Sequence, residues 1–348
     1  MPKVNAYAAT SPKSALVPFT VDRREPGPRD VAIHVEFCGI CHSDIHQARD
    51  EWGGSLFPMV PGHEIVGKVT RVGAEVKRFR VGDRVGVGCM VDSCRTCHSC
   101  GRHLEQFCEK GCAWTYNSTE MDRKTPTFGG YSTDVVVTED FVLRVPGNLD
   151  PAGAAPLLCA GITTYSPLRH WKTGKGTSVG VVGLGGLGHM AVKLAAAMGA
   201  EVTMLSTSKA KEADARRLGA TGFGLTSDRS TFKRLASKFD LIIDTISAPH
   251  DVAAYLGMVR LDGALVQVGV PPEPASVPAN ALIFGRKSLA GSLIGGIEET
   301  QEMLDFCGKH GITADVEVIP VQKVNEAYER MLKSDVRYRF SLDLSSIR

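Results

Sequence analysis

Residues 178–200 have the sequence SVGVVGLGGLGHMAVKLAAAMGA, in which an apolar β-type run leads into a glycine-rich turn and then into a helix rich in alanine and leucine. The turn has the spacing G-x-G-x-x-G, which allows a tight turn, a close backbone approach to a pyrophosphate, and close packing of helix on strand. Free N–H groups and a partial positive charge at the helix N-terminus favour phosphates. The alternative is a glycine-rich turn in some other α/β protein. The pattern predicts a dinucleotide site that includes Gly183, Gly185, Gly186, Leu187 and Gly188.

Strand and helix patterns alternate on the C-terminal side of this turn. Strand patterns lie at 201–206, 239–246 and 263–270, and helix patterns lie at 208–220 and 252–260. Alternation at this pace predicts a parallel sheet covered by helices on both faces. After Ser288 a helix, a strand, a helix and a strand are predicted at 298–311, 314–320, 324–335 and 338–344, so the chain returns to strand-rich structure.

The first 150 residues have a different pattern. Short runs rich in valine and isoleucine are broken by turns such as Glu25-Pro26-Gly27-Pro28. This predicts a mostly β region with irregular loops that contain the cysteines.

The strand after the glycine turn indicates which dinucleotide binds. An NAD site would carry an acidic residue near its end for the ribose hydroxyls. This chain instead has hydroxyl and cationic side chains, which would bind a 2′-phosphate. The residues are Ser206, Thr207, Ser208 and Lys211. We therefore predict NADP, with a solvated cationic helix face as the alternative.

Four cysteines lie within one loop at spacings that let a short segment surround a tetrahedral ion: Cys94, Cys97, Cys100 and Cys108. Four thiolates leave no position for water, which is typical of a structural zinc site. The alternatives are disulfides, which a reducing compartment disfavours, and an iron–sulfur cluster, whose common ferredoxin spacing is not matched. A nucleic-acid-binding zinc ribbon is disfavoured by the near-neutral charge.

A second, dispersed set consists of Cys41, His63 with Glu64, and Cys159. Each alone is more often an ordinary core residue. Two thiolates and one imidazole together would leave a fourth position on zinc for water or substrate, as a catalytic site requires. Position 67 is Gly, so His63-Glu64 does not begin an H-E-x-x-H metalloprotease motif.

Length, net charge and cysteine usage indicate how many domains, which partners and which compartment to expect. The chain has 348 residues, which predicts about two domains, and 40 Lys plus Arg against 38 Asp plus Glu give a net charge of +2. We expect no nucleic-acid or membrane partner. The N-terminus has no signal-peptide pattern, and clustered cysteines suit a reducing compartment, so we expect a cytoplasmic protein.

These motifs resemble those of the zinc-containing medium-chain alcohol dehydrogenases, in the cinnamyl-alcohol-dehydrogenase-like, NADP-dependent aldehyde reductase branch. The resemblance covers essentially the whole chain, in the motifs GICHSD, VPGHEIVG, GDRVGVG, the four-cysteine loop, GGYS, APLLCAGITTYSPL, GLGGLGH, GSLIGG and ETQEMLDFC. It implies an α/β fold with a GroES-like β-rich catalytic domain at 1–151 and 291–348. A Rossmann doubly wound parallel-sheet NADP-binding domain is implied at 152–290, with the active site in the cleft between the two domains. It also implies a homodimer formed through an edge strand near 288–294.

The resemblance implies a role for each matching residue. Cys41, His63 and Cys159 match the catalytic zinc ligands, Glu64 the carboxylate that can approach zinc, and the four-cysteine loop the structural zinc site, so two zinc ions per chain are expected. Asp44 matches the carboxylate that orients the ligand histidine. Ser43 matches the hydroxyl that bonds the substrate oxygen, and His46 the outer end of a proton relay. The residues matched to the nicotinamide end of the cofactor are Thr163, Ser292 and Ile294.

The predicted reaction is hydride transfer between NADP(H) and an alcohol/aldehyde pair, with zinc as Lewis acid. Because pocket residues form no motif, we expect only a broad range of aromatic and medium-chain aldehydes that are reduced to primary alcohols.

Overall fold

The computed structural model describes residues 3–347, which divide into two compact units. The first contains the described residues up to Ile162 and from Gly295 onward, and the second is Thr163–Ile294. The domain boundaries expected after residues 151 and 290 fall inside α2 (Pro151–Ala154) and β15 (Ser288–Gly291). No helix in the described part of the chain has the length and apolar character needed to cross a bilayer.

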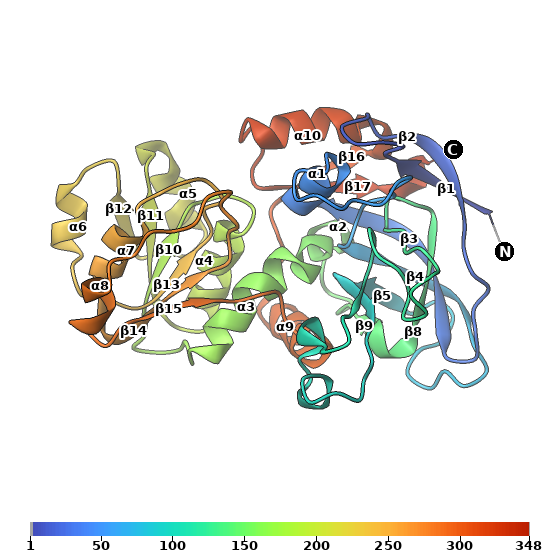
Figure 1. The fold of residues 1–348 in the computed structure, drawn as a ribbon, viewed down its shortest axis with the longest axis horizontal. Helices are drawn as coiled ribbons and strands as arrows, with labels where there is room; N and C mark the ends of the chain where they lie inside the picture. The colour runs from blue at the N-terminus through green and yellow to red at the C-terminus, as the bar shows by residue number, and fades with distance from the viewer. Residues whose placement is uncertain (1–2, 348) are drawn as a thin grey trace. The chain divides into compact units, whose positions relative to one another are not determined.

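The second unit is a doubly wound parallel sheet, as the alternating pattern predicted. Its strand order is β12-β11-β10-β13-β14-β15. Besides β15, the strands are β10 (Ser178–Val182), β11 (Glu201–Ser206), β12 (Gly222–Leu225), β13 (Phe239–Asp244) and β14 (Val259–Gln267). In Figure 1, α4 and α5 lie on one side of the sheet and α6, α7 and α8 on the other. These helices are α4 (Gly188–Ala197), α5 (Glu212–Arg217), α6 (Ser230–Arg234), α7 (Val252–Met258) and α8 (Asn280–Ile283).

The central strands of this sheet are apolar on both faces because helices cover both. Val182, Phe239 and Ile242 are fully buried and pack in one cluster with Leu256 of α7 and Leu265 of β14. Residues 259–260, predicted as the end of a helix, begin β14 instead.

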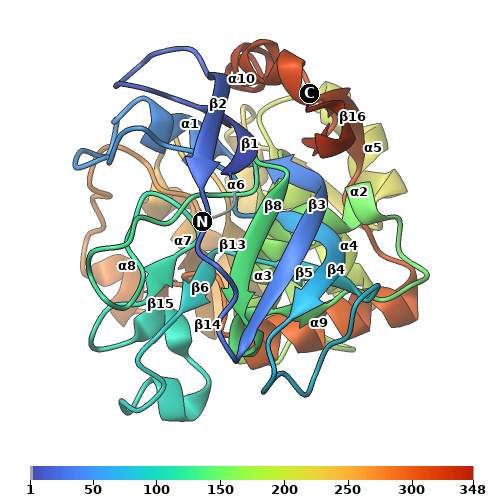
Figure 2. The same cartoon turned by 90° about the vertical axis from the view of Figure 1, so that its right-hand side faces the viewer.

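The first unit is built on a seven-stranded sheet with the order β16-β17-β3-β4-β5-β9, and β8 also pairs with β3. Its strands are β3 (Asp30–Ile40), β4 (Ile65–Val72), β5 (Arg84–Val87), β8 (Asp134–Thr138), β9 (Leu143–Arg144), β16 (Val316–Pro320) and β17 (Arg339–Asp343). Figure 2 shows β8, β3, β4 and β5 side by side. Two smaller pairs are β1 (Lys3–Ala8) with β2 (Val17–Asp22) and β6 (Met90–Asp92) with β7 (Ala113–Trp114).

The pairing of β3 with both β4 and β17 sets the position of the site. Ile40, at the end of β3, pairs with Phe340 of β17, and Cys38 pairs with Ile65 at the start of β4. The end of β3, the start of β4 and the start of β17 therefore lie side by side, where the three strands begin or end. The longer helices of this unit are α1 (His42–Ala48), α9 (Ile297–His310) and α10 (Val324–Leu332), and α3 (Ala160–His170) spans the boundary between the units.

Candidate active site and metal centres

Four buried side chains from three distant segments converge in the first unit. Cys41 caps the N-terminus of α1, His63 and Glu64 directly precede β4, and Cys159 directly precedes α3. One potential ligand atom from each residue lies within 4.8 Å of all the others. The Cys41 and Cys159 sulfurs are 3.9 Å apart. These four residues, which are dispersed in the sequence, thus form a single cluster.

The environment of His63 fits a metal ion. Its Nδ1 lies 3.5 Å from Oδ1 of Asp44, a carboxylate that is fully buried. The other Asp44 oxygen accepts hydrogen bonds from the Cys41 backbone N–H (2.8 Å) and the Tyr131 hydroxyl (3.1 Å). His63 Nε2 is buried and has no hydrogen-bond partner. An imidazole held by a carboxylate on Nδ1, with a buried and unpaired Nε2, is the arrangement of a metal-ligating histidine.

The charges of the cluster favour a cation. A hydrogen bond from the Cys159 thiol and the electrostatic influence of the adjacent His63 lower the pKa of the Cys41 thiol well below its ordinary value, although burial opposes them. Burial raises the pKa of Glu64 to about 7, and the nearby Arg339 guanidinium opposes that rise. Glu64 Oε2 is buried without a hydrogen-bond partner. A divalent cation would compensate both the thiolate and this oxygen.

The four-cysteine loop forms a second cluster. Its four sulfurs lie within 4.8 Å of one another. The Cys94 and Cys100 sulfurs are 3.9 Å apart, far beyond the ~2.05 Å of a disulfide, and all ten cysteines of the chain are free. Backbone N–H groups of Cys94 and Cys100 each lie 3.5 Å from a sulfur, those of Cys108 and Cys97 respectively. A backbone hydrogen bond from Thr96 is the largest of several that lower the pKa of Cys94 to about 6, as suits a thiolate ligand.

The second unit forms the glycine turn at the C-terminal end of β10. Gly183 has φ of 89°, which favours glycine, and a Cβ on Gly188 would lie 1.8 Å from the Gly183 carbonyl oxygen. A Cβ on Gly185 would meet nothing within 4 Å, so the backbone there is open to an approaching group. The three glycines thus have the three separate roles that a dinucleotide-binding turn requires.

The cations after β11 separate into two kinds. Lys211 Nζ donates to the Leu184 carbonyl oxygen at 2.7 Å, which places it against the glycine turn. The Ser208 backbone N–H donates to the Ser206 hydroxyl at 3.2 Å. Lys209 instead forms an ion pair with Glu212 of α5. Arg216 likewise pairs with Glu212, and Arg217 pairs with Asp214. The alternative of a solvated cationic helix face therefore describes these cations but not Lys211.

Comparisons with known proteins identify the family. The alcohol dehydrogenase GroES-like domain family matches residues 27–147, and the zinc-binding dehydrogenase family matches residues 186–309. The NADP-dependent alcohol dehydrogenase C 1 of Mycolicibacterium smegmatis is 58% identical over 100% of both chains. The chain belongs to the zinc-binding alcohol dehydrogenases. Aldehyde reductase YahK of Escherichia coli is 51% identical over 98% of each chain. A cinnamyl alcohol dehydrogenase structure from Sorghum bicolor superposes with a TM-score of 0.96, at 46% identity, over 100% of this chain and 99% of that one.

In this alcohol dehydrogenase, Ser43 and His46 both lie on α1. The Ser43 hydroxyl is 3.6 Å from the Cys41 sulfur, so it adjoins the first cluster. His46 is partly exposed; its ring stacks on Trp52, and its Nδ1 lies 2.5 Å from a Glu51 carboxylate oxygen. The structure thus gives His46 a carboxylate partner that no sequence motif indicated.

Arg339 is the residue of the site that sequence reasoning missed. It is the first residue of β17, is 3% exposed, and forms an ion pair with Glu64. A Cβ on Gly39 would lie 1.9 Å from Glu64 Oε2, so the glycine makes room for this carboxylate. The signal in the sequence was a charged residue, Arg339, within a predicted strand. That signal did not indicate that Glu64 would be its partner.

The residues matched to the nicotinamide end lie in the second unit. Thr163 is buried in α3, and Ser292 follows β15, with its backbone N–H 3.2 Å from the Gln267 carbonyl oxygen. Ile294 is 8% exposed with φ of 36°. That Thr163, Ser292 and Ile294 contact the nicotinamide end of a cofactor stays a prediction.

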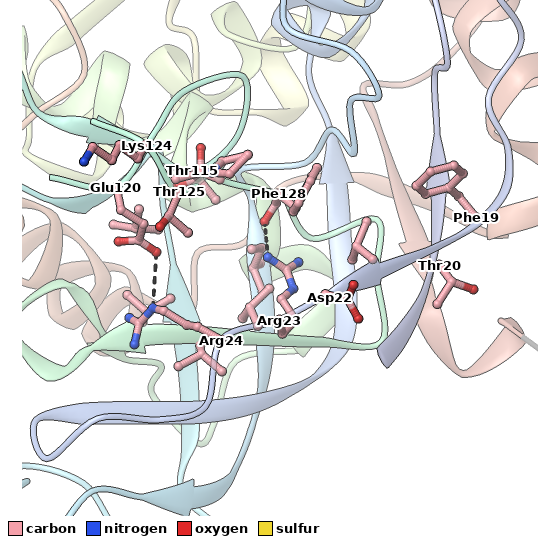
Figure 3. A pocket seen from close by; sticks show the side chains of 18 residues that line it. Phe19, Thr20, Asp22, Arg23, Arg24, Thr115, Glu120, Lys124, Thr125 and Phe128 are labelled. Carbon is pink, nitrogen blue, oxygen red and sulfur yellow. Dashed lines mark hydrogen bonds and ion pairs between the residues drawn. The ribbon is translucent and has the colours of Figure 1, made fainter. Parts of the chain in front are cut away.

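A separate cavity of about 600 Å³ lies in the first unit beside β2, β8 and the loop at 115–128. Figure 3 shows Arg23 among its lining side chains. The Arg23 guanidinium donates to the Phe128 and Gly129 carbonyl oxygens at 2.6 and 2.9 Å. Gly129 N–H in turn donates to the Val60 carbonyl oxygen at 2.8 Å. Arg23 therefore holds the GGYS turn against the segment before His63, and none of the predicted site residues line the cavity.

Proposed function

We propose that this dehydrogenase is a zinc-dependent NADP(H) oxidoreductase that reduces a broad range of aromatic and medium-chain aldehydes to primary alcohols. The observation that carries the proposal is the convergence of Cys41, His63 and Cys159 around a buried, unpaired imidazole nitrogen. These three residues would hold the catalytic zinc, with Glu64 beside it. Cys94, Cys97, Cys100 and Cys108 would hold a structural zinc, for two ions per chain.

The chemistry that zinc supplies when bound is Lewis-acid polarisation of the substrate oxygen. The protein residues supply orientation and proton transfer. Asp44 keeps His63 in the tautomer whose Nε2 is free to bind the metal. The Ser43 hydroxyl, beside Cys41, exchanges a proton with the substrate oxygen. His46 lies one helical turn further along α1, so it is placed to exchange that proton with solvent. Glu51 accepts from its Nδ1 and leaves its Nε2 available.

For the cofactor we propose NADP(H), bound by the glycine turn, with Ser206, Thr207, Ser208 and Lys211 at the 2′-phosphate and Thr163, Ser292 and Ile294 at the nicotinamide end. Two observations support this: Lys211 is directed at the turn, and the relative from M. smegmatis is named NADP-dependent.

The aromatic substrate range has local support. Tyr116 stacks on His63 with ring centroids 5.6 Å apart, and Trp52 stacks on His46 at 4.9 Å. Aromatic side chains beside the proposed reaction centre favour flat, apolar substrates. The aldehyde reductase name of the E. coli relative favours the reductive direction.

We further propose a cytoplasmic homodimer with the NADP-binding domain at 152–290. The ten free cysteines suit a reducing compartment. β15 is an edge strand of the six-stranded sheet, and such an edge can pair with that of a second copy.

The deciding experiment is an NADPH oxidation assay with benzaldehyde, cinnamaldehyde and hexanal, repeated with NADH, and a reverse assay with sorbitol. We expect turnover of all three aldehydes and a clear preference for NADPH. Turnover of sorbitol exceeding that of benzaldehyde, or a preference for NADH, would overturn the proposal in favour of a polyol dehydrogenase.

A further inference from the structure

The parallel sheet of the second unit reverses its strand order between β10 and β13. From β10 the chain proceeds to β11 and β12 on one side, whereas β13, β14 and β15 lie on the other. In open α/β sheets, ligands bind outside the carboxyl ends of the strands at such a point. Val182 pairs in register with Asp244, so the loop after β13 starts beside the glycine turn. The Thr245 hydroxyl lies 2.7 and 3.1 Å from the Val182 and Gly183 carbonyl oxygens.

A buried carboxylate and a histidine lie at this point. Asp244 is 1% exposed; its Oδ1 accepts from the Ile246 backbone N–H at 3.1 Å, and its Oδ2 lies 2.8 Å from His250 Nε2. His250 Nδ1 lies 2.9 Å from the Ala248 carbonyl oxygen. Both ring nitrogens therefore face oxygen acceptors, and only a doubly protonated ring can donate to both. The ring also packs edge-on against Tyr255, with centroids 5.8 Å apart.

The charge of this pair matters for a phosphate-bearing ligand. A carboxylate buried beside the glycine turn would repel a pyrophosphate, and the repulsion would be strong because the surroundings are poorly polarisable. Burial raises the pKa of Asp244, and the adjacent His250 opposes that rise, which indicates that the carboxylate needs its partner. A protonated His250 ring would cancel the charge of Asp244, and the contact of its Nδ1 with the Ala248 carbonyl oxygen also holds the segment 245–250.

We propose that His250 is a positioning residue for the anionic dinucleotide, acting by neutralising Asp244 next to the glycine turn. This inference rests on the proposed function, because it requires that NADP(H) binds at that turn. The G-x-G-x-x-G motif at 183–188 does not include this histidine.

The test is the dissociation constant of NADPH, measured by fluorescence titration with the full-length enzyme. Four chains are compared with wild type: His250→Ala, Asp244→Asn, the double variant, and Asp251→Asn as the matched control. Asp251 caps α7 by accepting from the Ala254 backbone N–H at 3.0 Å, and asparagine keeps that ability. Asparagine at 244 can still accept from Ile246 and donate to His250, so it removes the charge while keeping the hydrogen bonds.

We expect His250→Ala to weaken NADPH binding by about tenfold or more, because it leaves a buried charge without its partner. Asp244→Asn and Asp251→Asn should stay within about threefold of wild type, and the double variant should recover most of the lost affinity. At saturating NADPH, kcat should change little in every variant. If His250→Ala does not fold, His250→Gln, which keeps a donor but no charge, should show the same loss of affinity.

Wild-type affinity in His250→Ala would overturn the inference. So would a double variant that binds as weakly as His250→Ala, because a purely structural role is not rescued by removing the carboxylate charge. Failure of the wild-type chain to bind NADPH would overturn the proposed function itself, and the inference with it.

Discussion

Arg339, at the start of β17, forms a buried ion pair with Glu64, which directly precedes β4, although 275 positions separate them in the sequence. The pair connects the last strand of the chain to the proposed catalytic cluster. It also fixes one oxygen of Glu64 and leaves Oε2 without a partner. The carboxylate is thereby held beside Cys41 and His63.

Replacing Arg339 by methionine should destabilise the protein strongly. The change leaves Glu64 buried without a counter-charge, a loss that typically costs about 3–5 kcal/mol. Urea unfolding followed by tryptophan fluorescence measures it. The control is Arg71→Met, since Arg71 pairs with Glu25 at a site where both side chains are more than half exposed, and we expect a change below about 1 kcal/mol. Equal losses in the two variants would refute a special role for the buried pair.

Cys94→Ser should remove the proposed structural zinc. The zinc content should fall from about two to about one per chain, and the melting temperature should fall as well, since structural zinc contributes directly to folding. Cys112 is buried in the same region but outside the four-sulfur cluster. Cys112→Ser should therefore keep both ions in the same elemental analysis, and a loss of zinc there would contradict the ligand assignment.

Lys211→Gln should reduce the preference for NADPH over NADH. A charge-assisted hydrogen bond to the 2′-phosphate contributes about 1.5–3 kcal/mol, so KM for NADPH should rise about tenfold or more. KM for NADH, which lacks that phosphate, should change little. Lys209→Gln is the matched control because Lys209 is engaged by Glu212. A parallel rise for both cofactors in Lys211→Gln would argue against a 2′-phosphate contact.

Ser43→Ala should lower kcat for aldehyde reduction without loss of zinc. Loss of a positioned proton-transfer group typically costs about 10²–10⁴ in rate. Ser43→Thr, which keeps a hydroxyl, should recover part of the activity. Ser55→Ala is the control, because the Ser55 hydroxyl bonds the Gln47 carbonyl oxygen at 2.7 Å and has no part in the cluster. Full activity in zinc-loaded Ser43→Ala would exclude Ser43 from the relay.

The features that the sequence predicted correctly are those in which neighbouring residues act together. The turn at Gly183–Gly188 and the following helix form a local unit, so spacing alone indicated its geometry. The alternation from 178 onward likewise predicted the parallel sheet, because helices and strands have different hydrophobic periods. The four-cysteine loop is equally local, since its sulfurs converge within one loop.

Other relationships depend on which strands become neighbours. The pairing of β17 with β3 places Arg339 beside Glu64, and the pairing of β10 with β13 places Asp244, the partner of His250, opposite Val182 at the glycine turn. Likewise, only the folded structure distinguishes Lys211, which is directed at the glycine turn, from Lys209, which pairs with Glu212 at the start of α5. The sequence by itself therefore determined the kinds of site that this protein contains, because motifs specify local geometry. Only the tertiary structure decided which buried charges compensate one another, because a partner can come from any strand that packs alongside.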